Sequence, residues 1–106
     1  GYLISQPNGA AKKKDMRYRS RTEIISVILD AANGGATKTK IMYHAFLSYA
    51  QMKEYLRVLT ENNLLNYNVD TQTFKTTEKG LRFLDTFNQM DSMIKTPSLP
   101  QEQEQV

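Results

Sequence analysis

SYAQMKEYLRVLTENNLL, which spans residues 48–65, predicts one short amphipathic helix with a defined beginning and end. The Ser48 hydroxyl can cap the first turn and Gln51 can reach back to the Ser48 amide, so the helix begins with a capping box. Asn63 can take the left-handed conformation that ends a helix. One apolar stripe recurs at three- and four-residue intervals and predicts the buried face, formed by Met52, Tyr55, Leu56 and Leu59.

Two helices are predicted before this stretch. Ser20 and Glu23 form another capping box, which opens a helix whose wide apolar surface should make it the central support of the domain. That helix stops at Gly34-Gly35. Thr37 then caps a helix of barely two turns over residues 38–45. Because two short capped helices follow each other across a turn of about three residues, we expect a helix-turn-helix.

Residues 64–76 predict a small β-hairpin. Aromatic and β-branched residues lie on both sides of the turn residues 70–73, which favours two short strands. A two-stranded ribbon is marginal alone, so it should lean on the helices and leave its tip free to reach a groove or phosphate, as a wing does. The predicted fold class is therefore mainly α with a small β-hairpin (α+β), a winged helix-turn-helix with an extended C-terminal helix.

The last helix is predicted to follow the Thr77 cap, with Gly80 as a mild internal weakness. Leu81 and Leu84 are expected to pack on the domain. A second line has heptad-type spacing and predicts a homodimer through this helix, with the dimerisation residues Phe83, Phe87, Met90 and Ile94. The alternative is that all of these residues belong to the core of a monomer.

Charge is distributed unevenly along the chain, whose total net charge is +3. Residues 1–19 carry five basic side chains and one acidic one, so we expect a disordered basic N-terminal arm that suits phosphate contact. Residues 1–11 could equally be a remnant of an expression vector, with Met16 as the native start. The predicted domain spans residues 20–95, and residues 96–106 are expected to be a disordered acidic tail.

The residue types exclude several functions. The chain has no cysteine and its single histidine is His44, so disulfides, thiolate metal sites and histidine clusters are not expected. We find no acid/base pair or glycine-rich phosphate motif, and predict a protein that is not an enzyme and needs no cofactor. No apolar run is long enough to cross a bilayer, which favours a cytoplasmic protein without a membrane or small-molecule partner.

The positive evidence for function consists of surface side chains that can bind DNA. Glu54 opposes phosphate binding unless it pairs with Lys53 or Arg57 or accepts from a cytosine amino group, and Arg57 could be a groove contact or a solvated residue. The predicted DNA-binding residues are Ser48, Tyr49, Gln51, Lys53 and Arg57 on the recognition helix, Thr37, Lys38 and Lys40 on the preceding helix, Gln72 and Lys75 on the wing, and Arg17, Arg19 and Arg21 from the arm.

These segments resemble a known family. GGATKTKIMY (residues 34–43), LSYAQMKEYL (residues 47–56) and KTTEKGLRFL (residues 75–84) are similar to small archaeal winged helix-turn-helix proteins, predicted transcriptional regulators, over about residues 19–94. The resemblance implies a winged-helix fold and double-stranded DNA as the partner. Related archaeal chromatin proteins of this shape dimerise through the C-terminal helix. Where the family commonly has Gly after the recognition helix, this chain has Asn63, which also accepts a left-handed backbone.

The leading hypothesis is a double-stranded DNA-binding transcriptional regulator or architectural protein that acts as a homodimer. The recognition helix, residues 48–62, would enter the major groove. The wing, residues 64–76, and the basic arm would contact the backbone or the minor groove. The alternative is a winged-helix protein–protein interaction module that does not bind DNA.

Overall fold

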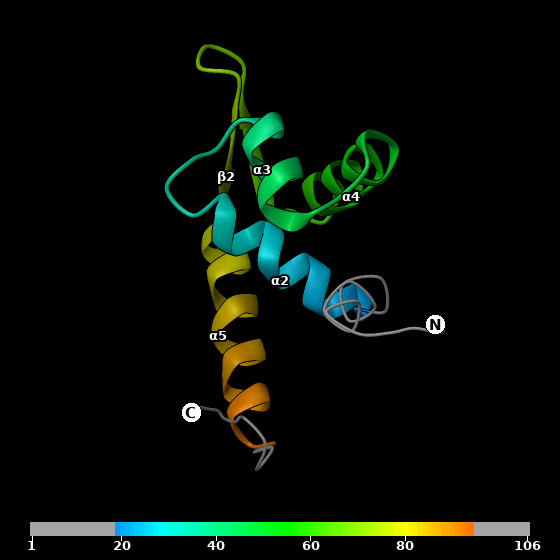
Figure 1. The fold of residues 1–106 in the computed structure, drawn as a ribbon. Helices are drawn as coiled ribbons and strands as arrows, with labels where there is room; N and C mark the ends of the chain where they lie inside the picture. Colours follow the sequence, from blue (N-terminus) through cyan, green and yellow to red (C-terminus); the bar gives the residue numbers. More distant parts are fainter. Residues whose placement is uncertain (1–18, 95–106) are drawn as a thin grey trace, which may run out of the picture.

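The computed structural model describes residues 19–94 and contains a helical domain with one antiparallel hairpin (Figure 1). The elements are α2 (Arg21–Ala31), α3 (Lys38–Ala45), α4 (Tyr49–Glu61), β1 (Leu65–Asn68), β2 (Thr73–Thr76) and α5 (Glu78–Ser92). The mainly α architecture with a β-hairpin confirms the predicted fold class. The predicted disorder of residues 1–18 and 96–106, and the contact predicted for Arg17, fall outside the described residues.

The helices begin at the predicted caps. Ser20, Thr37, Ser48 and Thr77 each accept a hydrogen bond from a backbone amide of the first turn. The capping box of α4 is reciprocal, because the Ser48 amide donates to Oε1 of Gln51 at 3.0 Å and the Gln51 amide donates to the Ser48 hydroxyl at 3.1 Å. Since these bonds are local, the beginnings of the helices follow directly from the sequence.

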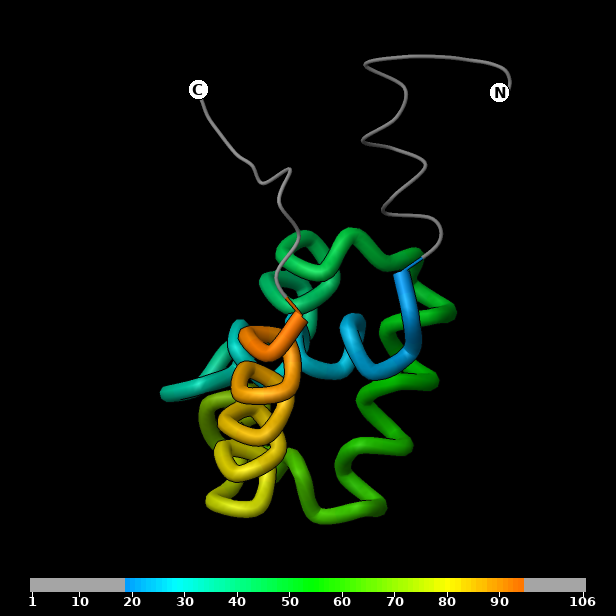
Figure 2. The backbone as a smooth tube through the Cα atoms, turned by 90° about the horizontal axis from the view of Figure 1, so that it is seen from below, coloured from blue at the N-terminus to red at the C-terminus, as the bar shows by residue number. Residues whose placement is uncertain are grey.

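The central element is α2, as its wide apolar surface predicts. It packs against α3, α5 and β2, and in Figure 2 it lies between α5 and α4. Its Ile28 and Leu29 are completely buried, and so is Ala32, the residue that caps its C-terminus. The stripe of α4 joins the same core with Met52, Leu56 and Leu59 buried. One core therefore fixes the positions of α3, α4 and α5.

The hairpin is attached to the end of α2. Its strands pair antiparallel with Leu65 opposite Thr76. Ala36, in the α2–α3 connection, exchanges two backbone hydrogen bonds with Phe74, of 2.8 and 2.7 Å. This antiparallel β-bridge ties the connection to β2. The buried Thr76 hydroxyl donates to the Leu29 carbonyl at 2.6 Å. The hairpin thus leans on the helices as expected for a marginal ribbon.

One expectation for α5 is wrong, because Leu81 was expected on the domain but is 40% exposed, whereas Leu84 packs against the core as expected. Phe83, predicted for the dimer contact, is partly buried and also packs against the core. The reason is the orientation of α5, because the buried Gly80 faces the core and residues three and four positions later share its face. Gly80 is also not merely a weakness, since its missing side chain permits the close approach of α5 to the hairpin.

We predict that Gly80→Ala destabilises the fold, although alanine is the better helix former. A Cβ at this position would lie 2.6 Å from the Leu64 carbonyl oxygen and 2.6 Å from Cγ2 of Thr76. The helix has to shift, at a cost of roughly 1–3 kcal/mol in free energy of unfolding, as in other overpacked sites. Urea denaturation followed by circular dichroism measures this change. Thr86→Ala, at an exposed position of α5, is the control and should be nearly neutral. Equal stability of Gly80→Ala and the parent would contradict the tight contact.

Candidate nucleic-acid interface

The helix-turn-helix consists of α3, a three-residue turn at positions 46–48, and α4. Phe46 takes the left-handed conformation with φ 55°, and its amide donates to the Tyr43 carbonyl. Leu47 is buried, and its amide donates to the Met42 carbonyl at 3.1 Å. Because α3 packs on both α2 and α4, the orientation of α4 is braced from behind.

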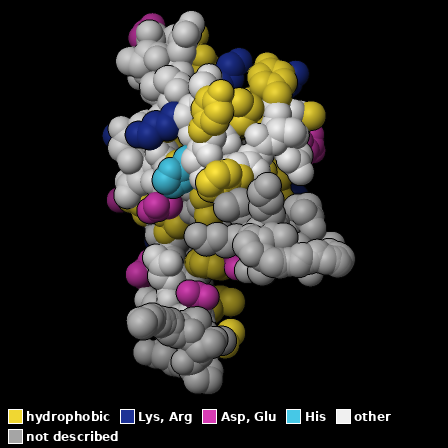
Figure 3. Space-filling model, viewed as in Figure 1, with side chains coloured by type: hydrophobic (Ala, Val, Ile, Leu, Met, Phe, Trp, Pro, Cys, Tyr) yellow, Lys and Arg dark blue, Asp and Glu magenta, His cyan; other side chains and the backbone are white. Residues whose placement is uncertain are grey.

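The outer face of α4 is available to a partner. The residues predicted to point away from the core, Ala50, Lys53, Glu54 and Arg57, are all exposed. The hydrophobic residues on the opposite side fix the helix to the core. Figure 3 shows basic side chains among exposed hydrophobic side chains over the part of the molecule formed by α3 and α4.

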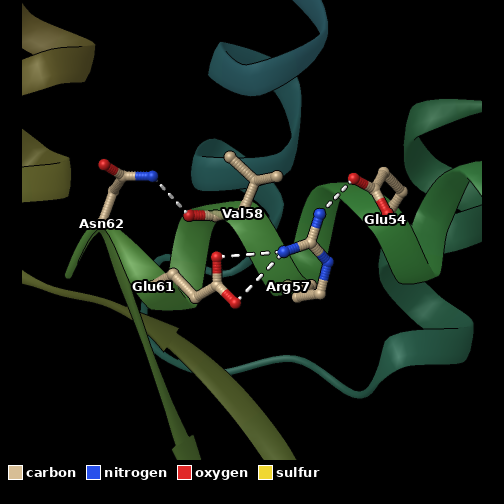
Figure 4. Close-up of polar contacts among 5 residues, drawn as sticks. All are labelled: Glu54, Arg57, Val58, Glu61 and Asn62. Atoms are coloured by element: carbon tan, nitrogen blue, oxygen red, sulfur yellow. Dashed lines mark hydrogen bonds and ion pairs between the residues drawn. The ribbon is translucent and has the colours of Figure 1, made fainter.

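Arg57 is held between two carboxylates of its own helix (Figure 4). Its Nη1 donates to both carboxylate oxygens of Glu61, at 3.0 and 3.1 Å, and its Nη2 donates to Glu54. The hydrogen bonds to Glu54 and Glu61 raise the pKa of the guanidinium above its already high ordinary value. The positive charge of Arg57 is paired with two carboxylates, so the part of the outer face from Glu54 to Glu61 is not basic.

The surface where α3 and α4 begin is basic. Nζ of Lys38, from α3, and Nζ of Lys53 lie 5.9 and 5.4 Å from the centre of the Tyr49 ring. We call these three residues the Lys–Tyr–Lys cluster. Neither lysine forms an ion pair with any residue in the range 19–94. Two ammonium groups that lack a carboxylate partner therefore converge where α3 and α4 begin, and the positive end of the α4 dipole adds to their field.

The predicted capping residues keep hydrogen-bonding capacity for a ligand. Oγ1 of Thr37 accepts from the Lys40 amide at 3.2 Å, and Ser48 and Gln51 bond to each other's amides. In each cap the side-chain oxygen acts as the acceptor, so the hydroxyl hydrogens and the Gln51 amide group remain donors. Phosphate or base contacts by these residues would not break the caps.

The remaining predicted contacts are spread over the domain. Arg19 is half-buried on the domain, where its Nη2 donates to the Ala45 carbonyl at the end of α3. Arg21 is exposed at the start of α2 and lines a groove together with Gln51. On the hairpin, Lys75 is exposed on β2, and Gln72 lies in the turn with φ 55°. Among the predicted contacts in residues 19–94, Lys38, Tyr49 and Lys53 come together around one ring.

A groove between α4 and the hairpin was not predicted. It has a volume of about 430 Å³ and connects the Lys–Tyr–Lys cluster with the aromatic pair Tyr67 and Phe74. We call it the α4–hairpin groove. The pairing of Tyr67 opposite Phe74 brings the two rings to 4.7 Å between their centres. The position of the turn predicts the register of the hairpin, and this register could have indicated that Tyr67 and Phe74 form an aromatic wall of the groove.

Two further features are absent from the part of the chain that the structure describes. Within it, no helix is long and apolar enough to cross a membrane. No group of three or more His, Cys, Asp and Glu side chains between residues 19 and 94 is arranged to hold a metal ion.

Comparisons with known proteins agree with this architecture. Residues 18–95 match the family model described as winged helix-turn-helix. Among curated proteins, none matches the chain. Among solved structures, Sso10a-2, a DNA-binding protein from Sulfolobus solfataricus, has a similar fold, with a TM-score of 0.66 and 23% sequence identity over 71% of this chain and 81% of that chain. Because the family model matches most of this chain, the chain belongs to the winged helix-turn-helix family.

Proposed function

We propose that this protein binds double-stranded DNA with the outer face of α4, as a transcriptional regulator or an architectural protein. The observation that carries the proposal is the Lys–Tyr–Lys cluster, which α3 and α4 form together within a winged helix-turn-helix. The likeness in fold to Sso10a-2, named as a DNA-binding protein, supports it. Such a role would place the protein on the nucleoid in the cytoplasm.

The beginning of α4 would supply both affinity and contacts to bases. In helix-turn-helix proteins the N-terminal residues of the recognition helix reach base edges in the major groove. Lys38 and Lys53 suit phosphates, since each phosphate that they neutralise releases counterions. The Gln51 amide group can donate and accept at adenine, while Ser48 suits a phosphate or a base edge. The hairpin then lies beside α4 as the wing, where Lys75 is exposed.

The middle of α4 would contribute selectivity. The carboxylates of Glu54 and Glu61 repel phosphates, but a carboxylate accepts well from the amino group of cytosine. Arg57 is held in place by both of them, so its remaining N–H groups are oriented before any base is met. We propose that this part discriminates between sites, while the Lys–Tyr–Lys cluster supplies attraction.

A second copy of the chain would cover the end of α5. Met90 and Ile94 are 57% and 73% exposed, and Figure 3 shows hydrophobic side chains along one edge of α5 toward its C-terminal end. Phe87, one turn before Met90, is half-buried and continues the same line. A homodimer through Phe87, Met90 and Ile94 would bury this stripe and double the number of phosphate contacts.

A protein–protein interaction module is the second candidate. Tyr43 and Phe46 are 71% and 65% exposed near the end of α3, and the middle of α4 carries more acidic than basic side chains. Exposed aromatic residues beside a nearly neutral helix suit a protein surface. DNA titrations separate the two candidate functions, because only the DNA-binding function predicts an affinity for DNA that depends on the lysines and on the salt concentration.

We predict that Lys53→Gln weakens binding to a random-sequence duplex by about fivefold at low salt. The loss of one phosphate contact should reduce the slope of log K against log salt concentration by about 0.9. Fluorescence anisotropy at several salt concentrations measures both quantities. Arg82→Gln removes an exposed charge from α5 and is the matched control, which should keep the parent slope. Binding by the parent that does not depend on salt would refute the proposal.

Glu54→Gln combined with Glu61→Gln should have the opposite effect. Removing two carboxylates from the outer face of α4 eliminates repulsion of phosphates and releases Arg57 to contact DNA. Affinity for the random-sequence duplex should rise by about three- to tenfold at low salt, measured by the same titration. Asp85→Asn combined with Asp91→Asn, two exposed positions on α5, is the charge-matched control. Unchanged affinity in the double variant would mean that the outer face of α4 does not meet DNA.

Met90→Glu should dissociate the homodimer. A charge placed in the apolar stripe of α5 has to be desolvated in the contact, whereas in the monomer Met90 is largely in water. Light scattering after size-exclusion chromatography should show the mass halved relative to the parent. Gln89→Glu adds the same charge at an exposed position on another side of α5 and should leave the mass unchanged. A parent protein with the mass of one chain would disprove the dimer.

A further inference from the structure

The α4–hairpin groove has the dimensions of a small-molecule site. Its volume of about 430 Å³ falls within the roughly 300–1,000 Å³ that such sites usually have. One wall is α4, and the opposite wall is the hairpin. Both walls are held independently of any ligand, because α4 is packed into the core and the hairpin is bonded to the end of α2. The groove is therefore preformed.

The interior of this groove is apolar. Met52 and Leu56 line it from α4, and Tyr67 and Phe74 line it from the hairpin. The two rings lie 4.7 Å apart with their planes inclined by 47°, so they present a continuous aromatic surface. Tyr67 is still 48% exposed, and this apolar surface has no partner among residues 19–94. A flat aromatic or alicyclic body fits such a surface.

One end of the groove is positively charged. Lys38 and Lys53 line it, with their ammonium groups 5.9 and 5.4 Å from the centre of the Tyr49 ring, and neither has a carboxylate partner in the described chain. At the other end, the charge of Arg57 is already neutralised by its two carboxylates. An anionic group would therefore be attracted to the lysine end only.

One hydrogen-bonding group in the groove wall is also unused. Oγ1 of Thr60 is buried and has no hydrogen-bond partner within residues 19–94, and Thr60 lines the groove. Buried hydroxyls normally have a partner, so this one is an exception within the wall of the groove.

We infer that the α4–hairpin groove binds a small amphipathic anion, with an aromatic or alicyclic body against Tyr67 and Phe74 and a carboxylate at the end lined by Lys38 and Lys53. The apolar surface provides the contact area, and the two ammonium groups select for the negative charge. Binding of this kind needs no DNA and no second copy of the chain.

The position of the groove has a consequence that rests on the proposed function. Lys53 and Tyr49 belong both to the groove and to the face proposed to meet DNA. A carboxylate that occupies the lysine end neutralises the charge on which phosphate attraction depends. The ligand and duplex DNA would therefore compete, and the bound anion would act as an effector that releases DNA.

The test is a titration of the full chain with 2-naphthoate, followed by two-dimensional ¹H–¹⁵N NMR without DNA. We expect saturable shifts confined to residues of α4 and the hairpin that line the groove, with a Kd on the order of 1 mM or tighter. The neutral analogue 2-naphthamide has the same ring system and should bind roughly three- to fivefold more weakly, since it lacks the attraction to two surface lysines.

Charge-removing variants make the test specific. In Lys38→Gln/Lys53→Gln the affinity for 2-naphthoate should fall to that for 2-naphthamide, whose own affinity should not change. Lys75→Gln/Arg82→Gln is the charge-matched control, because Lys75 of β2 and Arg82 of α5 are exposed basic residues that do not line the groove. Thermal unfolding of each variant verifies that its fold is intact. Tyr67→Ala should lower the affinity for both compounds, because it removes part of the aromatic wall.

Three results would overturn the inference: no saturable shifts, equal affinity of the parent for both compounds, or shifts centred on Tyr43 and Phe46. Competition is measured separately, as the decrease in duplex affinity that 2-naphthoate causes. If the protein does not bind duplex DNA at all, the proposed function fails, whereas the NMR titration still decides whether the groove binds the anion.

Discussion

The structure depends on the contact between Thr76 and the end of α2. A helix leaves its last carbonyl groups without partners, and the buried C-terminus of α2 needs donors from elsewhere in the chain. The Thr76 hydroxyl donates to the Leu29 carbonyl and the Thr76 amide to the Ala32 carbonyl at 3.1 Å. The hairpin thereby completes the helix that supports α3 and α5. Gly80 lies against the same junction, so the beginning of α5 is set by it as well.

Sequence reasoning succeeded where the physical cause is local. The caps at Ser20, Thr37, Ser48 and Thr77 involve residues three positions apart, and the left-handed Asn63, with φ 62°, involves one residue. The orientation of α5 depends instead on the distance between two elements. From the sequence alone, Gly80 is predicted only to weaken its helix. Its packing role depends on the carbonyl oxygen of Leu64, which would lie 2.6 Å from a Cβ at this position.

In the candidate site, too, the sequence predicted the local features but not those that depend on how elements pack together. Helical periodicity alone predicts that Lys53 and Arg57 are exposed, and the spacing of Glu54, Arg57 and Glu61 allows their ion pairs. The convergence of Lys38 and Lys53 on one ring could not be predicted, because it depends on how two helices cross. The α4–hairpin groove adds a third element, the hairpin, whose register places Tyr67 opposite Phe74.

Charges on α4 are sorted along its length, and this affects what the helix can do. A uniformly basic helix is attracted to any phosphate and has little reason to prefer one orientation. Here the attraction is concentrated near the beginning of α4, where Lys53 lies close to Lys38 of α3 and to the positive end of the helix dipole, while Glu54 and Glu61 repel phosphates. We therefore propose that the helix enters a groove by its N-terminal end, with its middle part selecting among bases. The same sorting leaves two unpaired ammonium groups beside an apolar groove, so the proposed DNA affinity and the proposed anion site have one electrostatic origin.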